Sequence, residues 1–208
     1  MAISPAKEKI LRRIRKALSN PVPLPFPESE GTQSVFTTSS EDPTVVFAEE
    51  FTRLQGKFAY CPDEDNLKDQ LIQLFRERNF TKIWYADDRI YGYLNPSLES
   101  HGDLASCDAS VTLCESLVAR TGTIVLSSSL QQGRTGSVYA PIHICIAFTS
   151  QLVYDIGDAL QALKDKYNNN LPSLISFASG PSRTADIEKT LVTGVHGPKE
   201  VYCFLVEG

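Results

Sequence analysis

The chain has 208 residues, of which 42% are hydrophobic, and its 20 basic and 25 acidic side chains give a net charge of −5. This length suits one domain with or without a small appendage, and it allows a buried core that needs no disulfide or metal. The composition excludes fibrous, disulfide-scaffold and disordered classes. No apolar run is long enough for a membrane span, and the acidic balance argues against nucleic acid as the main partner.

The first 19 residues differ in charge from the rest. They carry six basic side chains and one acidic one, so the other 189 residues sum to −10. Ser4 and Pro5 suit a helix start, and Ile10 and Ile14 recur at helical spacing. We predict a basic amphipathic helix over 1–19. It could bind a membrane surface, an RNA or a partner subunit, or it could pack on its own domain or on a second copy, so a homo-oligomer stays open.

A proline-rich segment follows this helix. Prolines occupy every second position from 21 to 27, and a stretch rich in Ser, Thr and Glu comes next. Proline at that spacing neither continues a helix nor pairs in a central strand. We therefore predict an extended linker over 20–42 and a compact domain over 43–208.

Helical and strand patterns alternate along this domain. Helices are predicted around 47–54, 63–75, 115–119, 153–167 and 184–190, and strands over 57–61, 82–85, 109–113, 123–128, 142–148, 174–178 and 201–206. Residues 87–106 have no clear pattern. The alternation predicts an α/β fold with a mostly parallel sheet, helices on both faces, and ligands at the carboxyl ends of the strands.

The five cysteines are widely spaced and include no C-x-x-C pair. We expect buried, reduced thiols, no iron–sulfur or zinc site built by this chain, and a cytoplasmic location. No nucleophile elbow, P-loop, dinucleotide-binding fingerprint or H-E-x-x-H motif is present.

Two central segments carry polar groups that could contact a ligand. Thr121, Gly122 and Thr123 lead into a buried strand, and a glycine-containing loop over 131–137 includes Arg134. The hydroxyls and glycines suit contacts to a polar ligand, and Arg134 could pair with an anion. The alternative is a flexible, hairpin-like connection between two core strands.

His143 lies within an apolar strand, where it could be a core residue or a ligand. Further along, a Gly-Pro-Ser turn precedes Arg183, and the predicted helix over 184–190 would offer free amides to an anion. The alternative is an ordinary helix capped by Ser182 or Thr184.

The last motif, Gly194-Val195-His196-Gly197-Pro198, holds a histidine between two glycines. His196 could act as an acid, a base or a metal ligand, or it could be structural. Together with His143 and one carboxylate it could bind a metal, although the spacing does not require this.

Taken together, these segments resemble the LUD domain. The matching runs are Thr121–Leu126, Arg134, Pro141–Ile144, Gly180–Glu188 and Gly194–Pro198. The basic helix and the proline-rich linker agree with the resemblance as well. It implies a fold of the NagB/RpiA/CoA-transferase type with an N-terminal helical arm. It also implies that the chain works with iron–sulfur cluster proteins in oxidising L-lactate to pyruvate.

On this resemblance we expect His196 to be the catalytic residue. We expect no metal and no cofactor on this chain, with iron–sulfur clusters carried by partner proteins. The residues expected to contact a small carboxylate substrate are Thr121, Gly122, Thr123, Arg134, His143, Ser182, Arg183, Thr184, Asp186 and Gly197.

One residue departs from the family pattern. The family carries an acid directly before Thr-Gly-Thr, where this chain has Arg120. In the distant CoA-transferases a glutamate is the nucleophile, so Arg120 removes that role and points to another substrate or a non-catalytic role. The alternative functions are an independent enzyme or binder for a CoA-linked or phosphorylated small molecule, and a pure interaction protein. The sequence does not decide whether the chain is itself an enzyme.

Overall fold

The computed structural model describes residues 5–19, 40–94, 100–187 and 190–208. It divides into two units, Met1–Ser39 and Ser40–Gly208. In the first unit, α1 (Pro5–Leu18) exposes Ile10 and Ile14 between its basic side chains. Most of the predicted linker lies outside the described residues. No helix in the described ranges is both long enough and apolar enough to cross a membrane.

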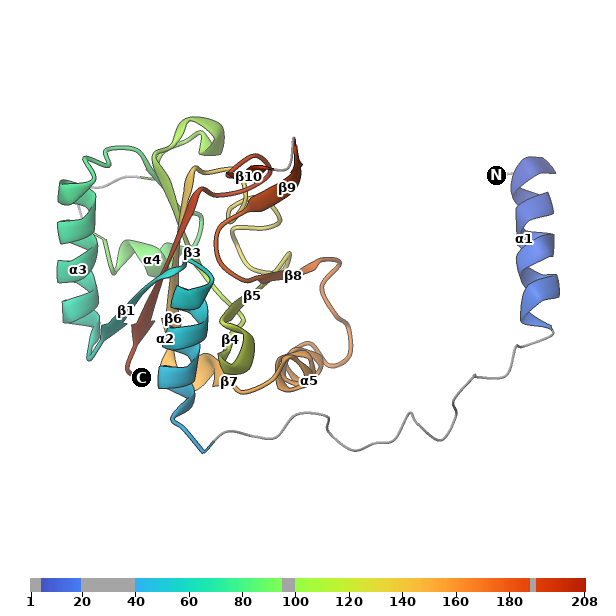
Figure 1. The fold of residues 1–208 in the computed structure, drawn as a ribbon, viewed down its shortest axis with the longest axis horizontal. Coiled ribbons are helices and arrows are strands. Elements are labelled where there is room, and N and C mark those ends of the chain that lie inside the picture. Colours follow the sequence, from blue (N-terminus) through green and yellow to red (C-terminus); the bar gives the residue numbers. More distant parts are fainter. Residues whose placement is uncertain (1–4, 20–39, 95–99, 188–189) are drawn as a thin grey trace. The chain divides into compact units, whose positions relative to one another are not determined.

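The second unit is built on a five-stranded sheet, part of which can be followed in Figure 1. Its strands are β1 (Lys57–Cys61), β2 (Ile83–Trp84), β3 (Ala109–Leu113), β6 (Ile142–Phe148) and β11 (Glu200–Val206). They lie in the order β1-β11-β6-β3-β2, and every neighbouring pair is parallel. The predicted α/β class with a mostly parallel sheet is confirmed.

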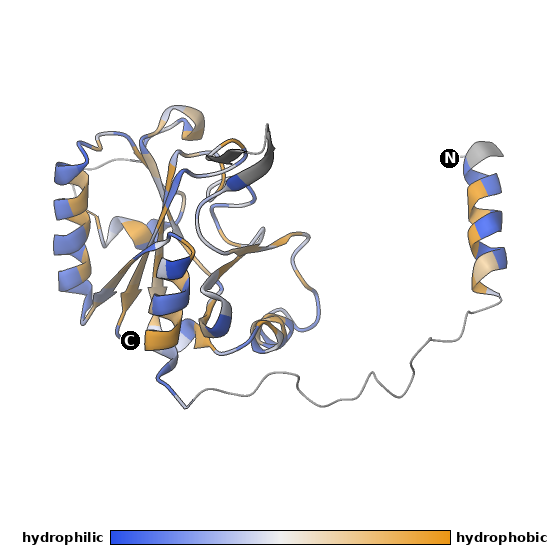
Figure 2. Cartoon of the chain, viewed as in Figure 1, coloured by the Kyte–Doolittle hydropathy of each residue, from blue (hydrophilic) through white to orange (hydrophobic). Residues whose placement is uncertain are grey.

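Successive residues of these strands alternate between two hydrophobic clusters, because side chains of a strand point to opposite faces. On β11, Tyr202 and Phe204 join one cluster, and Cys203 and Leu205 join the other. The first cluster packs under α3 (Glu64–Glu77) and α4 (Asp88–Tyr91). Figure 2 shows the apolar side of α3 turned toward the sheet.

The opposite face of the central sheet is covered by α2 (Pro43–Arg53) together with a second sheet. This sheet comprises β7 (Leu152–Val153), β4 (Ser116–Val118), β5 (Thr123–Ser127) and β8 (Ile175–Ala178), in the order β7-β4-β5-β8. α5 (Ile156–Lys166) packs on it through a third cluster. The predicted helices on both faces are therefore present, and on this face a second sheet adjoins α2.

Aspartate side chains fix where the main helices begin. Asp42, Asp63 and Asp155 precede α2, α3 and α5, and each accepts a hydrogen bond from a backbone amide of the first turn. These bonds satisfy amides that have no partner within the helix. The starts of α2 and α3 are close to those predicted from the sequence.

Two predicted helices are wrong. Residues 115–119 contain β4, which pairs antiparallel with β5. Residues 184–190 lie in a hairpin of β9 (Arg183–Ile187) and β10 (Thr190–Thr193), in which Thr184 pairs with Val192. β9 and β10 are rich in β-branched residues, which fit a paired strand better than an isolated short helix, whereas β4 has only Val118 and is decided by its pairing with β5.

The connection from β5 to β6, residues 128–141, is not the hairpin-like link considered from the sequence, because its two strands belong to different sheets. We call it the strap. Gln132 Nε2 donates to the carbonyl oxygen of Leu113 at 2.8 Å. A Cβ added to Gly136 would lie 2.7 Å from Trp84. The strap is thus tied to β3 and lies close to β2.

Candidate functional site

An inner cavity of about 170 Å³ lies at the amino-terminal ends of β6 and β11, facing β5 and β8. Its lining residues are Leu126, Ser137, Val138, His143, Ser176, Ala178, Gly180, Ser182, His196, Gly197, Pro198 and Val201. The expectation of ligands at the carboxyl ends of the strands is therefore not met by this cavity. Four of the predicted site residues, His143, Ser182, His196 and Gly197, come together in it.

His143 is the most buried polar group of the inner cavity, with 1% of its surface exposed. Its Nε2 lies 2.8 Å from Thr112 Oγ1 on β3. Burial lowers the pKa of His143 from 6.5 to about 4. The imidazole is therefore neutral near pH 7 and can offer one N–H donor or one lone pair, but no charge.

His196 lies at the mouth of the inner cavity and is exposed. It also lines an outer cavity of about 370 Å³, together with Val138, Tyr139, Gly194, Val195 and Gly197. The two cavities share Val138, His196 and Gly197, so a ligand in the inner one would meet His196 at its open side.

Backbone contacts hold the histidine loop against Ser182. The amide of Ser182 donates to the carbonyl oxygen of Pro198 at 2.9 Å, and the amide of Gly194 donates to the carbonyl oxygen of Ser182 at 3.0 Å. A Cβ on Gly197 would lie 2.9 Å from Ser182 Cβ. Glycine at this position therefore permits the close approach that places His196 and Ser182 in one cavity.

The Thr-Gly-Thr segment lies outside the inner cavity and packs beneath α2. Gly122 has a φ of +54°, and a Cβ there would lie 2.4 Å from the backbone nitrogen of Phe51. Thr123 Oγ1 is within hydrogen-bonding distance of Thr121 Oγ1 at 2.8 Å and Ser179 Oγ at 2.6 Å. Thr121, Gly122 and Thr123 thus contact α2, Ser179 and one another, and they do not line the inner cavity.

Neither predicted arginine lines the inner or the outer cavity. Arg134 donates to Ser173 Oγ at 2.7 Å, and Arg183 donates to the carbonyl oxygen of Leu54. Thr184 and Asp186 lie on β9, and their side chains are outside the described part. Because β9 and β10 pair as antiparallel strands, the described residues there do not form the predicted anion-binding helix start.

Arg120, the residue that departs from the family pattern, is engaged in an ion pair. Its Nε lies 2.7 Å from Asp155 Oδ2, and Asp155 also caps α5. The hydrogen bond from Arg120 lowers the pKa of Asp155 below its ordinary value. Arg120 thus links η2 (Ala119–Thr121) to the start of α5.

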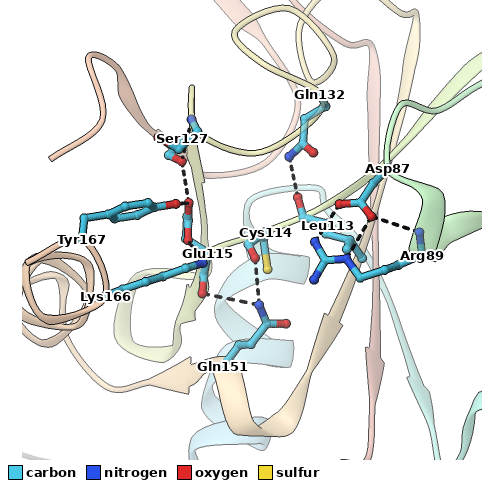
Figure 3. Close-up of polar contacts among 11 residues, drawn as sticks. Asp87, Arg89, Leu113, Cys114, Glu115, Ser127, Gln132, Gln151, Lys166 and Tyr167 are labelled. Carbon is cyan, nitrogen blue, oxygen red and sulfur yellow. Dashed lines mark hydrogen bonds and ion pairs between the residues drawn. The ribbon is translucent and has the colours of Figure 1, made fainter. Parts of the chain in front are cut away.

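Sequence analysis missed a buried carboxylate, Glu115, whose side chain is 1% exposed. Figure 3 shows Ser127, Lys166 and Tyr167 converging on it. Burial by itself raises the pKa of Glu115, but the hydrogen bonds from Lys166, Ser127 and Tyr167 together outweigh it and lower that pKa. The sequence predicts a helix over 115–119, and no local pattern there indicates that Glu115 is buried.

Thr112 was missed as well, although a signal existed. On β3, Ala109, Val111 and Leu113 alternate with Ser110 and Thr112. This period of two predicts that both hydroxyls share one face of the sheet. That face is the one from which His143 projects into the inner cavity.

The described residues contain no group of three or more His, Cys, Asp or Glu side chains placed to hold a metal ion. All five cysteines are free thiols and buried. Burial raises the pKa of Cys61 to about 11, and the pKa values of Cys114 and Cys145 are also raised. Burial therefore favours the protonated thiol at Cys61.

The geometry defines an α/β protein with a small histidine-lined cavity between two sheets. The family model of the LUD domain matches residues 97–206. Lactate utilization protein C from Oceanobacillus iheyensis is 31% identical over 182 residues, covering 85% of this chain and 74% of that protein. The chain belongs to the LUD domain family.

Other relatives match over different lengths. Lactate utilization protein C from an Exiguobacterium species is 30% identical, over 96% of this chain and 95% of that protein. An uncharacterized protein from Neisseria meningitidis is 38% identical over 94 residues. The match covers only 40% of the length of the Neisseria protein. For lactate utilization protein C from Deinococcus radiodurans, the matched part spans 50% of that protein.

The fold has a counterpart among solved structures. A DUF162 family protein from Deinococcus radiodurans superimposes with a TM-score of 0.62, over 82% of this chain and 99% of that one. Its sequence identity is 19%, so it supports the architecture alone. The expected likeness to the NagB/RpiA/CoA-transferase type stays a prediction.

Proposed function

We propose that this chain is a subunit of a lactate-utilization system and holds a small carboxylate in its inner cavity. The system oxidises L-lactate to pyruvate with iron–sulfur cluster proteins as partners. The observation that carries the proposal is the convergence of His143, Ser182, His196 and Gly197 on one cavity. The names of the relatives called lactate utilization protein C support lactate as the substrate of the system.

The size of the inner cavity suits a three-carbon acid. A water molecule takes about 30 Å³ of liquid volume, so about 170 Å³ admits a molecule of several heavy atoms. Leu126, Val138 and Val201 provide apolar walls, and Ser137 and Ser182 provide hydroxyls. A few polar groups in an apolar lining are typical of small-molecule sites.

The carboxylate charge needs hydrogen-bond donors, because burying an unpaired charge is costly. No arginine lines either cavity, and His143 is neutral. We therefore place the carboxylate toward the open side near His196 and Ser182. The methyl group then lies deeper in the cavity, and the hydroxyl, on the carbon next to the carboxylate, stays near His196.

Oxidation of L-lactate breaks the O–H bond and the C2–H bond, forms a C=O bond, and releases two protons and two electrons. In the proposal His196 accepts the hydroxyl proton, since a ring nitrogen of imidazole can act as a general base. The C2 proton passes to solvent. The two electrons pass to the iron–sulfur proteins, which the proposal places among the partners.

The proposal places the system in the cytoplasm, where free thiols such as these five cysteines persist in reduced form.

The test is lactate-dependent dye reduction by this chain co-expressed with the products of its neighbouring genes. His196→Ala and Ser182→Ala should each lower activity by at least tenfold, a loss typical of removing an acid–base group. His101→Ala is the matched control, because His101 pairs with Ser106 and lines neither cavity. Unchanged activity in both cavity variants would remove the site assignment.

A second candidate is an independent binder or enzyme for a CoA-linked or phosphorylated molecule. The outer cavity of about 370 Å³ favours it, because it gives a larger ligand room beyond the inner cavity. A ligand at about ten times its Kd stabilises a protein by about 1.4 kcal/mol. A thermal-shift screen in which CoA esters and sugar phosphates leave the melting temperature unchanged would count against this candidate.

A further inference from the structure

Two buried hydroxyls lie beside His143 on the neighbouring strand. β3 and β6 are parallel, with Ser110 opposite His143 and Thr112 opposite Cys145. Ser110 and Thr112 are both 0% exposed. Thr112 Oγ1 reaches His143 Nε2 at 2.8 Å, whereas Ser110 Oγ has no hydrogen-bond partner among the described residues.

We propose that Thr112 is a positioning residue that holds His143 in the tautomer with hydrogen on Nδ1. The inner cavity then presents a neutral N–H donor and selects a ligand with an acceptor oxygen, such as the carbonyl of a 2-oxo acid. The tautomer is inferred from the hydrogen bond between Thr112 Oγ1 and His143 Nε2 and from the cost of burying a hydroxyl that has no acceptor. The ligand class rests on the proposed function.

The hydroxyl of Thr112 decides the tautomer. A buried hydroxyl that donates to no acceptor carries the full desolvation penalty. Among the described residues, His143 Nε2 is the acceptor within hydrogen-bonding distance of the Thr112 hydroxyl. The hydroxyl therefore donates to Nε2. A neutral imidazole with a lone pair on Nε2 has its hydrogen on Nδ1.

This tautomer fixes what His143 offers to a ligand. Nε2 is occupied by Thr112, and Nδ1 has no hydrogen-bond partner among the described residues. His143 lines the inner cavity, so Nδ1–H is the polar group that it has left for a bound molecule. A carbonyl or carboxylate oxygen matches that donor, whereas an ammonium group does not. The apolar walls strengthen such a bond by excluding water.

The tautomer can be measured directly in the full chain labelled with ¹⁵N-histidine. Long-range ¹H–¹⁵N correlation spectra at pH 7 distinguish a protonated ring nitrogen from an unprotonated one, and His143→Gln assigns the signal. We expect protonated Nδ1 and unprotonated Nε2. Thr112→Val should abolish this preference, Thr112→Ser should keep it, and Ser110→Ala, the matched control, should leave it unchanged. Wild-type His143 protonated on Nε2 would overturn the proposal, even if Thr112→Val fails to fold.

The ligand class has its own measurement. Calorimetric titration of the full chain with pyruvate should give a Kd roughly tenfold weaker in Thr112→Val, the loss expected for one hydrogen bond, and an unchanged Kd in Ser110→Ala. If pyruvate does not bind while the tautomer is as stated, the ligand class and the proposed function fail and the positioning role stands. Equal affinities of wild type and Thr112→Val for pyruvate would show that Thr112 has no part in selecting the ligand.

Discussion

The histidine of the inner cavity links burial to pH dependence. Burial lowers the pKa of His143 to about 4. The unfolded chain takes up a proton near pH 6.5 and the folded chain does not, so stability is present above pH 6.5 and is lost as the pH falls toward 4. At acidic pH, His143 therefore lowers the free energy of unfolding.

Replacing His143 with Gln should remove this loss. Between pH 7 and pH 5 the wild type should lose about 2 kcal/mol more unfolding free energy than His143→Gln. Urea unfolding at both pH values measures the difference. Equal losses in the two proteins would show that His143 is not held neutral by burial.

Glu115 provides the opposite case, a buried acid kept charged by its partners. Its lowered pKa stabilises the fold above the ordinary glutamate pKa, and this contribution is lost as the pH falls through the folded value. Glu115→Gln should destabilise the protein by about 2 kcal/mol at pH 7, because the Lys166 ion pair is lost and the hydroxyl donors lose a charged acceptor. Chemical denaturation checks this value. Arg53→Gln, which breaks an exposed ion pair, should change stability by less than about 0.5 kcal/mol.

Four of the eleven predicted site residues line the inner cavity. Residue chemistry explains why three of them could be predicted from the sequence. His143, His196 and Gly197 stand out in sequence because each is costly or unusual in its local pattern. Arg134 and Arg183 stand out equally, but their partners, Ser173 and Leu54, lie far along the chain. No local pattern predicts such long-range contacts.

At the scale of elements, the strands of mainly apolar sequence were predictable, whereas β4, β9 and β10 were not. The predicted strand over 142–148 coincides with β6, whose residues are apolar except for His143. β4 has only three residues, and β9 and β10 mix apolar residues with charged or hydroxyl ones, so their patterns do not separate strand from helix. Pairing with a partner strand decides such segments.

The turn between β4 and β5 yields a prediction about packing. Gly122→Ala should destabilise the protein by about 3 kcal/mol, because the new Cβ combines a left-handed φ with a clash against the backbone of α2. Gly133→Ala is the matched control. It has a similar φ of +61° and open space around it, and it should cost only about 1 kcal/mol. Urea unfolding compares the two, and equal costs would show that contact with α2 is unimportant.

At the scale of the whole molecule, the two units divide the charge found in the sequence. The basic α1 belongs to the first unit, and the three hydrophobic clusters all belong to Ser40–Gly208. The net charge of −5 is therefore a sum over two unlike parts. The sequence could predict this division, because a run of prolines separates the two patterns.

Deleting residues 1–19 should leave the folding of the second unit intact. The melting temperature should change by less than about 2 °C, since a shift of 1 kcal/mol corresponds to roughly 2–4 °C at this size. Differential scanning calorimetry measures it. A drop of 5 °C or more would show that α1 contributes to the core stability of the domain.

The most direct test of the account is whether a small hydroxy acid enters the inner cavity. Titration of L-lactate into the full chain labelled with ¹⁵N-histidine reports on His101, His143 and His196 separately. We predict that the ring signals of His143 and His196 shift with a common saturation curve while His101, which lines neither cavity, stays constant. Unchanged signals from His143 and His196 at saturating L-lactate would contradict the account.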